Sequence, residues 1–442
     1  MKGKVLLFYG MFEDNQSYAY VPWSMFFLAT YLRKHEYEPI IIDEFVTPDF
    51  EAIIRDNAED TILFGVSAMT CRQITAGIDA IRIFRKYNKT AKVAWGGAHS
   101  TANPDETLQN ELIDYVFVGQ SFISLPKLLG SIHGEGKDNN RRVICSEYPT
   151  REHLLEFPDF ELEKLNFNKY INPETRLLNY CSSIGCPGSC SFCSWGGKHN
   201  RYSFPVDRII NDVELLVKKY DLTTVLIQDA TFFSNKEMVM SFAEQIIRKN
   251  IRCFWRAGAR VIELNKFTRD DFKLLASSGL DWIFVGVENT VPRIMKMFKK
   301  VFPVEMVDNI LNNLKGVDII FFTSMIFGVP TETTGELLIN KKNIERWLKI
   351  NNNFYCQKCI FTPYSGTPLT DLAIKHGFNP PQSLEDWAKH PLFVDTRRSL
   401  ETHRTWLTPS FQREYFEILS GIAAGRSRNT TLKPAGTRPE RQ

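Results

Sequence analysis

The 442-residue sequence lacks any long hydrophobic run. Its longest apolar stretches, Lys4–Gly10 and Ile319–Gly328, are far shorter than the 18 or more residues that a membrane-spanning helix needs. It also lacks the small-residue cleavage site of a secretory signal, since the first apolar run is followed by Glu13-Asp14-Asn15. We therefore expect a cytoplasmic protein without a membrane partner. Apolar residues (43%) and charged residues (24%) are close to globular averages, which excludes a disordered or collagen-like chain.

A strong excess of basic residues is also absent. Lysine and arginine (54) barely outnumber aspartate and glutamate (51). The excess lies in residues 425–442, which contain Arg426, Arg428, Lys433, Arg438 and Arg441 against Glu440. Because nucleic-acid-binding domains usually carry a basic footprint, this balance disfavours a polynucleotide partner. In a reducing compartment, the nine cysteines are better explained as ligands, catalysts or core residues than as disulfides.

Short apolar segments alternate with helix-length patterns in residues 1–132. The expected parallel strands are Lys4–Tyr9, Glu38–Asp43, Thr61–Val66, Lys92–Trp95 and Tyr115–Val118. Five strands joined by helical crossovers predict an α/β, doubly wound, Rossmann-like domain, whose ligand lies at the carboxyl ends of the strands. The loops at those ends contain Gly10, Ser67–Arg72, Gly96-Gly97-Ala98-His99 and Gly119.

After a linker at residues 133–176, strands and helices alternate again in residues 177–367. The expected strands are Leu177–Ser182, Thr223–Gln228, Arg252–Gly258, Trp282–Val287, Ile319–Ile326 and Asn353–Phe361. Six βα units predict a partial (β/α)6 barrel of the TIM type, with its chemistry at the carboxyl ends of the strands. Residues 368–424 are interpreted as a C-terminal extension, and residues 425–442 as a disordered tail.

The strongest chemical signal is Cys186-Pro-Gly-Ser-Cys190-Ser-Phe-Cys193, directly after the first expected barrel strand. Three thiolates at this spacing can hold one face of an iron–sulfur cluster and leave one iron open. A zinc site would need a fourth ligand, which Cys181 or His199 could supply. Unligated core cysteines are the least favoured reading, because a loop of Pro, Gly and Ser has no core to fill.

The CxxxCxxC loop after a barrel's first strand resembles the radical S-adenosylmethionine (SAM) enzymes. That resemblance implies a [4Fe–4S] cluster on Cys186, Cys190 and Cys193, whose open iron binds SAM and whose electron cleaves it to a 5′-deoxyadenosyl radical. Other positions match the family's cofactor-binding motifs at successive strand ends. They are Phe192 beside the adenine, Asp229 for the ammonium of SAM, Arg260 for its carboxylate, Glu288 for its polar groups, and the turn that starts at Gly328.

A doubly wound domain before such a barrel resembles the cobalamin-binding class of radical SAM proteins. This resemblance implies cobalamin as a third cofactor, bound near Ser67, Thr70, Gly96, Gly97 and His99. The Asp-x-His-x-x-Gly string, whose histidine ligates cobalt in many cobalamin domains, does not occur in the sequence. We therefore expect base-off cobalamin without a histidine ligand, its lower face meeting the Met69-Thr70-Cys71-Arg72 loop. Ligation of cobalt by His99 or Cys71 is the less favoured alternative.

The resemblance implies a cobalamin-dependent radical SAM methyltransferase. Its substrate would be an unactivated carbon, or less favourably phosphorus, of a small molecule or peptide. The radical would remove a hydrogen, and methylcobalamin would supply the methyl group. A flavodoxin- or ferredoxin-like reductant would donate the electrons. The alternatives are a cyclase or rearrangement enzyme of the same class, and a non-catalytic cobalamin or metal-binding module. Cys356 and Cys359 form a further CxxC, but positions three apart in a strand point to opposite faces, which disfavours shared metal ligation.

Overall fold

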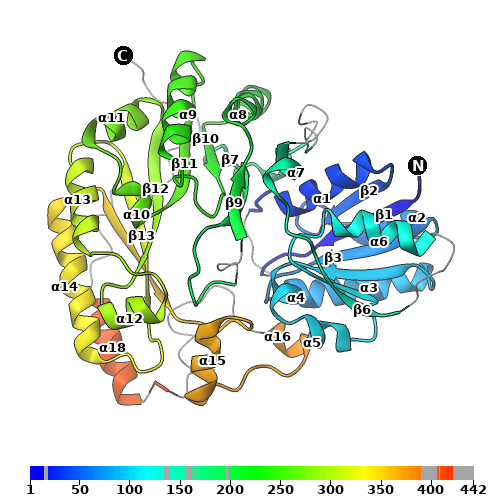
Figure 1. Cartoon of the computed structure of the whole chain (residues 1–442). Coiled ribbons are helices and arrows are strands. Elements are labelled where there is room, and N and C mark those ends of the chain that lie inside the picture. Colours follow the sequence, from blue (N-terminus) through cyan, green and yellow to red (C-terminus); the bar gives the residue numbers. More distant parts are fainter. Residues whose placement is uncertain are drawn as a thin grey trace. The chain divides into compact units, whose positions relative to one another are not determined.

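The computed structural model describes residues 1–13, 18–133, 140–155, 157, 162, 166–194, 199–389, 406–407 and 409–421 (Figure 1). The chain divides into two compact units. The first consists of Met1–Tyr170 with the later segments Tyr364–Thr367 and Asn379–Phe393, and the second contains the other residues. Within the described ranges, no helix is both long and apolar enough to cross a membrane.

The first unit contains a parallel sheet of six strands in the order β2-β1-β3-β4-β5-β6. The strands are β1 (Lys4–Tyr9), β2 (Glu38–Asp43), β3 (Thr61–Ser67), β4 (Lys92–Gly96), β5 (Tyr115–Val118) and β6 (Arg142–Cys145). The predicted doubly wound fold is confirmed, with its switch point between β1 and β3. The sheet has six strands rather than the expected five. Strand β6 pairs with β5 within the segment interpreted as a linker, and its half-exposed residues give no buried apolar run.

Helices cover both faces of this first sheet. On one face, α1 (Trp23–Lys34) and α6 (Ser124–His133) pack on the side chains of Val5, Leu7 and Leu63. On the other, α2 (Phe50–Asn57) and α3 (Gln73–Tyr87) pack on Phe8, Phe64 and Trp95. Trp387 of α16 (Leu384–Trp387) joins this second core. The short elements α4 (Ala98–Ala102), α5 (Pro104–Gln109), α7 (Arg151–Leu155) and η1 (Asn168–Tyr170) complete the unit.

The second unit contains a parallel sheet of six strands in the order β14-β13-β12-β11-β10-β7. The strands are β7 (Leu177–Tyr180), β10 (Thr224–Ile227), β11 (Phe254–Arg260), β12 (Leu280–Glu288), β13 (Ile320–Phe327) and β14 (Phe354–Ile360). Each lies within two residues of its predicted position. A two-stranded antiparallel hairpin, β8 (Ser183–Cys186) and β9 (His199–Ser203), was not predicted. The hairpin follows β7 directly, and Cys186 is the last residue of β8.

Helices pack along one face of this second sheet (Figure 1). They are α8 (Val206–Tyr220), α9 (Lys236–Arg248), α11 (Arg269–Ser277), α13 (Glu305–Leu314) and α14 (Thr334–Ile350). The unit also contains α10 (Val261–Leu264), α12 (Pro292–Met297), α15 (Pro368–Lys375) and α18 (Pro409–Ser420). Burial alternates along β13: Phe321, Thr323 and Met325 are buried, whereas Phe322 and Ser324 are half-buried. Because successive strand residues face opposite sides, Phe322 and Ser324 lie on the face that the helices leave open.

Candidate active site

The cysteine loop of the second unit is shaped around Gly188. A Cβ at this glycine would lie 3.4 Å from Cys186 Sγ, 3.8 Å from Cys190 Sγ and 3.9 Å from Arg260 Cζ. Two thiols and a guanidinium therefore surround this one glycine. All three cysteines of the motif, including Cys193, are half-buried. Such a position suits ligands that must meet a cofactor from outside the protein core.

Ser191 fixes the middle of the cysteine loop to neighbouring elements. Its backbone N–H donates to the Phe298 carbonyl (3.0 Å), and its hydroxyl donates to the Met297 carbonyl at the end of α12 (2.5 Å). Its own carbonyl accepts from the N–H of Leu369 (3.0 Å). The ring of Phe192 packs edge-on against that of Phe298, with 5.2 Å between centroids. The loop is therefore held in place before any cofactor binds.

A charged pair lies at the end of β12. Lys300 Nζ contacts Glu288 Oε1 (3.1 Å), and the Ser324 hydroxyl donates to Glu288 Oε2 (3.0 Å). The two charged groups lie directly over Gly286, where a Cβ would displace them. Glu288 has a φ of 67°, a conformation that costs energy for a residue with a side chain and is often found at functional sites. Sequence analysis identified Glu288 but missed Lys300, which reaches the site from beyond α12.

The Glu288–Lys300 pair lies close enough to two thiols to affect their electrostatics. Burial raises the pKa of the Cys190 thiol, whereas the positive charges of Lys300 and Arg260 oppose that rise. Burial, reinforced by the charge of Glu288, raises the pKa of Cys359 to about 11. The carboxyl ends of β11, β12 and β14 thus place Arg260, Glu288 and Cys359 in one region. Cys356 is fully buried and Cys359 half-buried, in accordance with the prediction that they face opposite ways.

Asp229 lies in a different setting from the expected contact with SAM. Its Oδ1 accepts from the N–H groups of Ser182 (2.8 Å) and Ser183 (3.1 Å), and its Oδ2 accepts from the Ser182 hydroxyl (2.6 Å) and Arg201 (2.9 Å). A carboxylate offers about four acceptor positions, and all four are used. The side chain has no exposed surface. Asp229 therefore holds the start of the β8–β9 hairpin, and this geometry does not favour a direct contact with the ammonium of SAM.

The turn after β13 begins at Gly328, whose φ of 74° favours glycine. The Gly328 N–H donates to Glu332 Oε2. Burial raises the pKa of Glu332 to about 8, so this side chain is mostly protonated at neutral pH. Gly328 and Glu332 thus form a closed structural turn at the end of β13.

The raised pKa of Glu332 predicts a specific pH dependence of stability. The folded protein keeps the proton on Glu332 that the unfolded chain releases near pH 4.5. The stabilising contribution of this side chain is therefore fully present below that pH. It declines as the pH rises toward about 8, by at most about 1.4 kcal/mol per pH unit. Urea unfolding at a series of pH values should show that Glu332→Gln lacks this decline. Parallel pH profiles for the variant and the parent protein would contradict it.

At the strand ends of the first unit, two turns meet tightly. A Cβ at Gly97, whose φ is 101°, would lie 2.5 Å from the carbonyl oxygen of Ala68 and 3.0 Å from Ser67 Oγ. Thr70 Oγ1 is 2.9 Å from His99 Nδ1, and the His99 ring has no exposed surface. Ser67, Thr70, Gly96, Gly97 and His99 therefore lie together, as expected. The bare Cα of Gly97 allows the turn after β4 to pack directly on the turn after β3.

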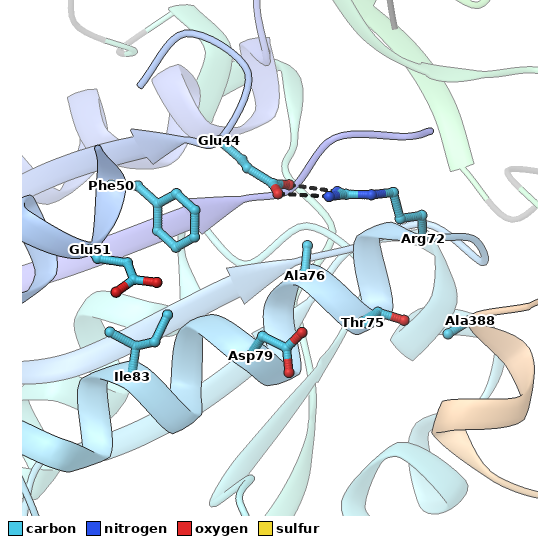
Figure 2. A pocket seen from close by; sticks show the side chains of 9 residues that line it. All are labelled: Glu44, Phe50, Glu51, Arg72, Thr75, Ala76, Asp79, Ile83 and Ala388. Atoms are coloured by element: carbon cyan, nitrogen blue, oxygen red, sulfur yellow. Dashed lines mark hydrogen bonds and ion pairs between the residues drawn. The ribbon is translucent and has the colours of Figure 1, made fainter. Parts of the chain in front are cut away.

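A cavity of about 550 Å³ lies in the first unit, between α2 and α3; Figure 2 shows the side chains that line it. Its lining residues are Glu44, Phe50, Glu51, Arg72, Thr75, Ala76, Asp79, Ile83 and Ala388. Glu44 and Arg72 form a bidentate ion pair (2.7 and 2.9 Å) where β2 and β3 end. Sequence analysis did not identify Glu44, since an acidic residue after a strand has no distinctive spacing.

No group of three or more His, Cys, Asp or Glu side chains that could hold a single metal ion occurs in the described part of the chain. Thiolates that bind separate irons of one cluster need not meet at a single point. The three half-buried cysteines, two of which lie around Gly188 together with Arg260, fit such a cluster. In the first unit, a Cβ at Gly96 would meet only the Val66 carbonyl oxygen, at 3.9 Å, and the room at this strand end fits the close approach of a large flat ligand.

Two family models match the chain. The radical SAM superfamily matches residues 180–340, and the B12 binding domain matches residues 17–129. The chain is thus a radical SAM enzyme that carries a cobalamin-binding domain. Its cofactors are a [4Fe–4S] cluster, SAM and cobalamin.

Proteins similar to this chain include methyltransferases. An uncharacterised methyltransferase of Pyrococcus horikoshii is 26% identical over 373 residues, covering 80% of this chain and 78% of that protein. The anaerobic magnesium-protoporphyrin IX monomethyl ester cyclase of Rubrivivax gelatinosus is 23% identical over 378 residues, covering 78% of this chain and 64% of that protein. The structure of the radical SAM methyltransferase TsrM from Kitasatospora setae, with tryptophan and a SAM analogue bound, has the same fold. Its TM-score is 0.67 at 16% identity, covering 93% of this chain and 83% of that one. The chain is therefore methyltransferase-like.

Proposed function

We propose that the protein transfers a methyl group from SAM, by way of its cobalamin, to an unactivated carbon of a small molecule or peptide. Phosphorus is the second choice of acceptor. The reaction would take place in the cytoplasm with electrons from a flavodoxin- or ferredoxin-like donor. The observation that carries the proposal is the convergence of Cys186, Cys190 and Arg260 around Gly188, in a chain that also has a cobalamin-binding domain.

The proposed roles follow from the side chains present. Cys186, Cys190 and Cys193 hold the cluster. Arg260 and Lys300 supply two positive charges beside the cysteine loop, which suit the carboxylate of SAM. The cofactors supply the radical and the transferable methyl group when bound, and the protein aligns them.

Other residues complete the cofactor sites in this proposal. Phe192 provides an apolar face for the adenine, and Glu288 accepts hydrogen bonds from polar groups of SAM. Asp229 and the Gly328 turn act as positioning elements of that site. Ser67, Thr70, Gly96, Gly97 and His99 form the wall of the cobalamin site.

One experiment separates methyl transfer from other radical chemistry without knowledge of the substrate. The anaerobically reconstituted protein, loaded with cobalamin and reduced, should convert SAM to S-adenosylhomocysteine, because a methyl group has left. The same protein without cobalamin should form none. Formation of 5′-deoxyadenosine alone, with cobalamin bound, would favour a cyclase or rearrangement enzyme, an alternative supported by the sequence relationship to the cyclase of Rubrivivax gelatinosus.

The proposed role of Arg260 is testable by itself. Arg260→Ala should weaken SAM binding and leave the iron content unchanged, because the guanidinium lies beside the thiols without being a ligand. Arg252→Ala, an exposed arginine just before the same strand, is the matched control. Equilibrium dialysis with SAM would measure both dissociation constants. Equal values for the two variants would count against this assignment.

A further inference from the structure

Four aromatic side chains of the second unit contact one another across three neighbouring strands. The ring of Trp282 stacks on that of Phe284, with 5.6 Å between centroids, and Phe284 contacts Phe322 of β13 at 5.4 Å. Phe322 in turn stacks on Tyr355 of β14, with 4.9 Å between centroids and 15° between the ring planes. These four residues form an aromatic surface on β12, β13 and β14.

The aromatic surface lies on the face of the sheet that the helices leave open. Phe322 is half-buried, whereas Phe321, which precedes it and faces the other side, is fully buried. Phe284 and Tyr355 are also half-buried, and Gln357, two residues after Tyr355 and therefore on the same face, is exposed. Water thus reaches large apolar rings, and a ligand that covered them would gain from their burial.

The sheet leaves room beside Phe284, because the residue that pairs with it on β11 is Gly258. A Cβ at Gly258 would meet only backbone oxygens, that of Asp229 at 3.4 Å and that of Ala230 at 3.9 Å. No side chain therefore occupies the place next to the Phe284 ring. A glycine within a strand often marks the position where a ligand approaches the backbone closely.

The aromatic surface carries no net charge. The guanidinium of Arg256 lies over the Trp282 ring, with 4.9 Å from Cζ to the ring centroid. Arg256 is buried and makes a bidentate ion pair with Asp281 (2.9 and 2.8 Å), so its positive charge is neutralised within the protein. The part of a ligand that lies against these rings therefore needs no charge of its own.

The aromatic surface adjoins the site that we propose for SAM, one step further from the strand ends. Ser324 follows Phe322 by two residues on β13, and its hydroxyl donates to Glu288 (3.0 Å). Two residues of a strand span about 7 Å. A ring bound on the aromatic surface would thus lie close to a cofactor at the ends of the strands.

We propose that the aromatic surface binds a flat, uncharged aromatic ring of the methyl acceptor, and that the exposed amide of Gln357 binds a polar group of the same molecule. The inference rests on the proposed function, because it assigns the acceptor to the open face of the second sheet. Aromatic rings that stack or meet edge to face gain more than the burial of apolar area alone provides. An aliphatic acceptor would forgo this gain.

Two probes with the same carbon skeleton test this preference in the parent protein. The full-length protein, anaerobically reconstituted with its cluster, is dialysed to equilibrium against 2-naphthol or against decahydro-2-naphthol, which keeps the hydroxyl but has no aromatic ring. The parent protein should bind 2-naphthol about tenfold more tightly. This comparison does not depend on the folding of any variant.

A leucine substitution on β13 locates the binding site. Phe322→Leu keeps an apolar side chain but removes the ring, so it should abolish most of the preference for 2-naphthol. Phe321→Leu, one residue earlier and on the helix side of the sheet, is the matched control and should retain the preference. The iron content and circular dichroism of both variants show whether they are folded.

The outcomes separate this proposal from the proposed function. Equal affinities of the parent protein for the two probes would overturn the aromatic site, as would a preference that Phe322→Leu retains in full. Either result would leave methyl transfer intact, provided that the cobalamin-loaded parent protein forms S-adenosylhomocysteine. A clear preference for 2-naphthol in a protein that forms no S-adenosylhomocysteine would instead disprove methyl transfer, while the aromatic site would stand.

Discussion

Simultaneous replacement of Cys186, Cys190 and Cys193 by alanine is expected to abolish the iron–sulfur cluster. Thiolates are the protein's ligands for such a cluster, and two of the three thiols lie around Gly188. Anaerobically reconstituted protein should lose its broad visible absorption and its ability to cleave SAM reductively. Because these side chains are only half-buried, the variant should still fold.

Cys359→Ala is the informative control for the cluster. Cys359 is half-buried like the three motif cysteines and lies within the influence of Glu288, yet it comes from β14. We expect this variant to keep the full iron content and the visible spectrum. Loss of the cluster in Cys359→Ala would reveal a fourth protein ligand and remove the open iron. A complete cluster in the triple variant would disprove the assignment.

The strands of both sheets other than β6 could be predicted, because each is an apolar run bounded by turn residues. Strand β6 could not, since its half-exposed residues give no buried apolar run. The hairpin β8–β9 could not, since its residues, such as Ser183 and Arg201, have no apolar periodicity. What holds it is a set of contacts far apart in the sequence, above all the bonds of Ser182 and Arg201 to Asp229. A strand-end carboxylate is visible in a sequence, but the partners that occupy it are not.

The same limit explains why Lys300 was missed. Motif reasoning examines the residues at the strand ends, such as Glu288, whereas Lys300 reaches its position because α12 ends and the chain turns back toward β12. His99 illustrates the converse. The sequence identifies a histidine in a glycine-rich turn, and the structure shows its ring buried against Thr70. The sequence thus predicts which types of residue lie at a strand end, but not where their side chains point.

The Glu288–Lys300 pair is expected to dominate the local stability of the barrel's strand ends. The side chains of Glu288 and Lys300 are only 9% and 12% exposed. Removal of the ammonium would therefore leave a carboxylate with little water and, among the residues that the structure describes, the Ser324 hydroxyl as its remaining side-chain partner. The loss of one partner from a buried ion pair costs about 3–5 kcal/mol. We therefore expect Lys300→Met to lower the free energy of unfolding by about 3 kcal/mol.

Lys299→Met provides a control that differs by one position in the chain. Lys299 is exposed, so the same substitution should change the free energy of unfolding little. The double variant Glu288→Gln/Lys300→Met should recover most of the stability lost in Lys300→Met, because no unpaired charge remains in the site. Urea unfolding of the four proteins measures these differences. If Lys300→Met were no less stable than Lys299→Met, the pair would be unimportant for stability. The strained backbone of Glu288 would then have to be maintained by Ser324 and the packing of β12 alone.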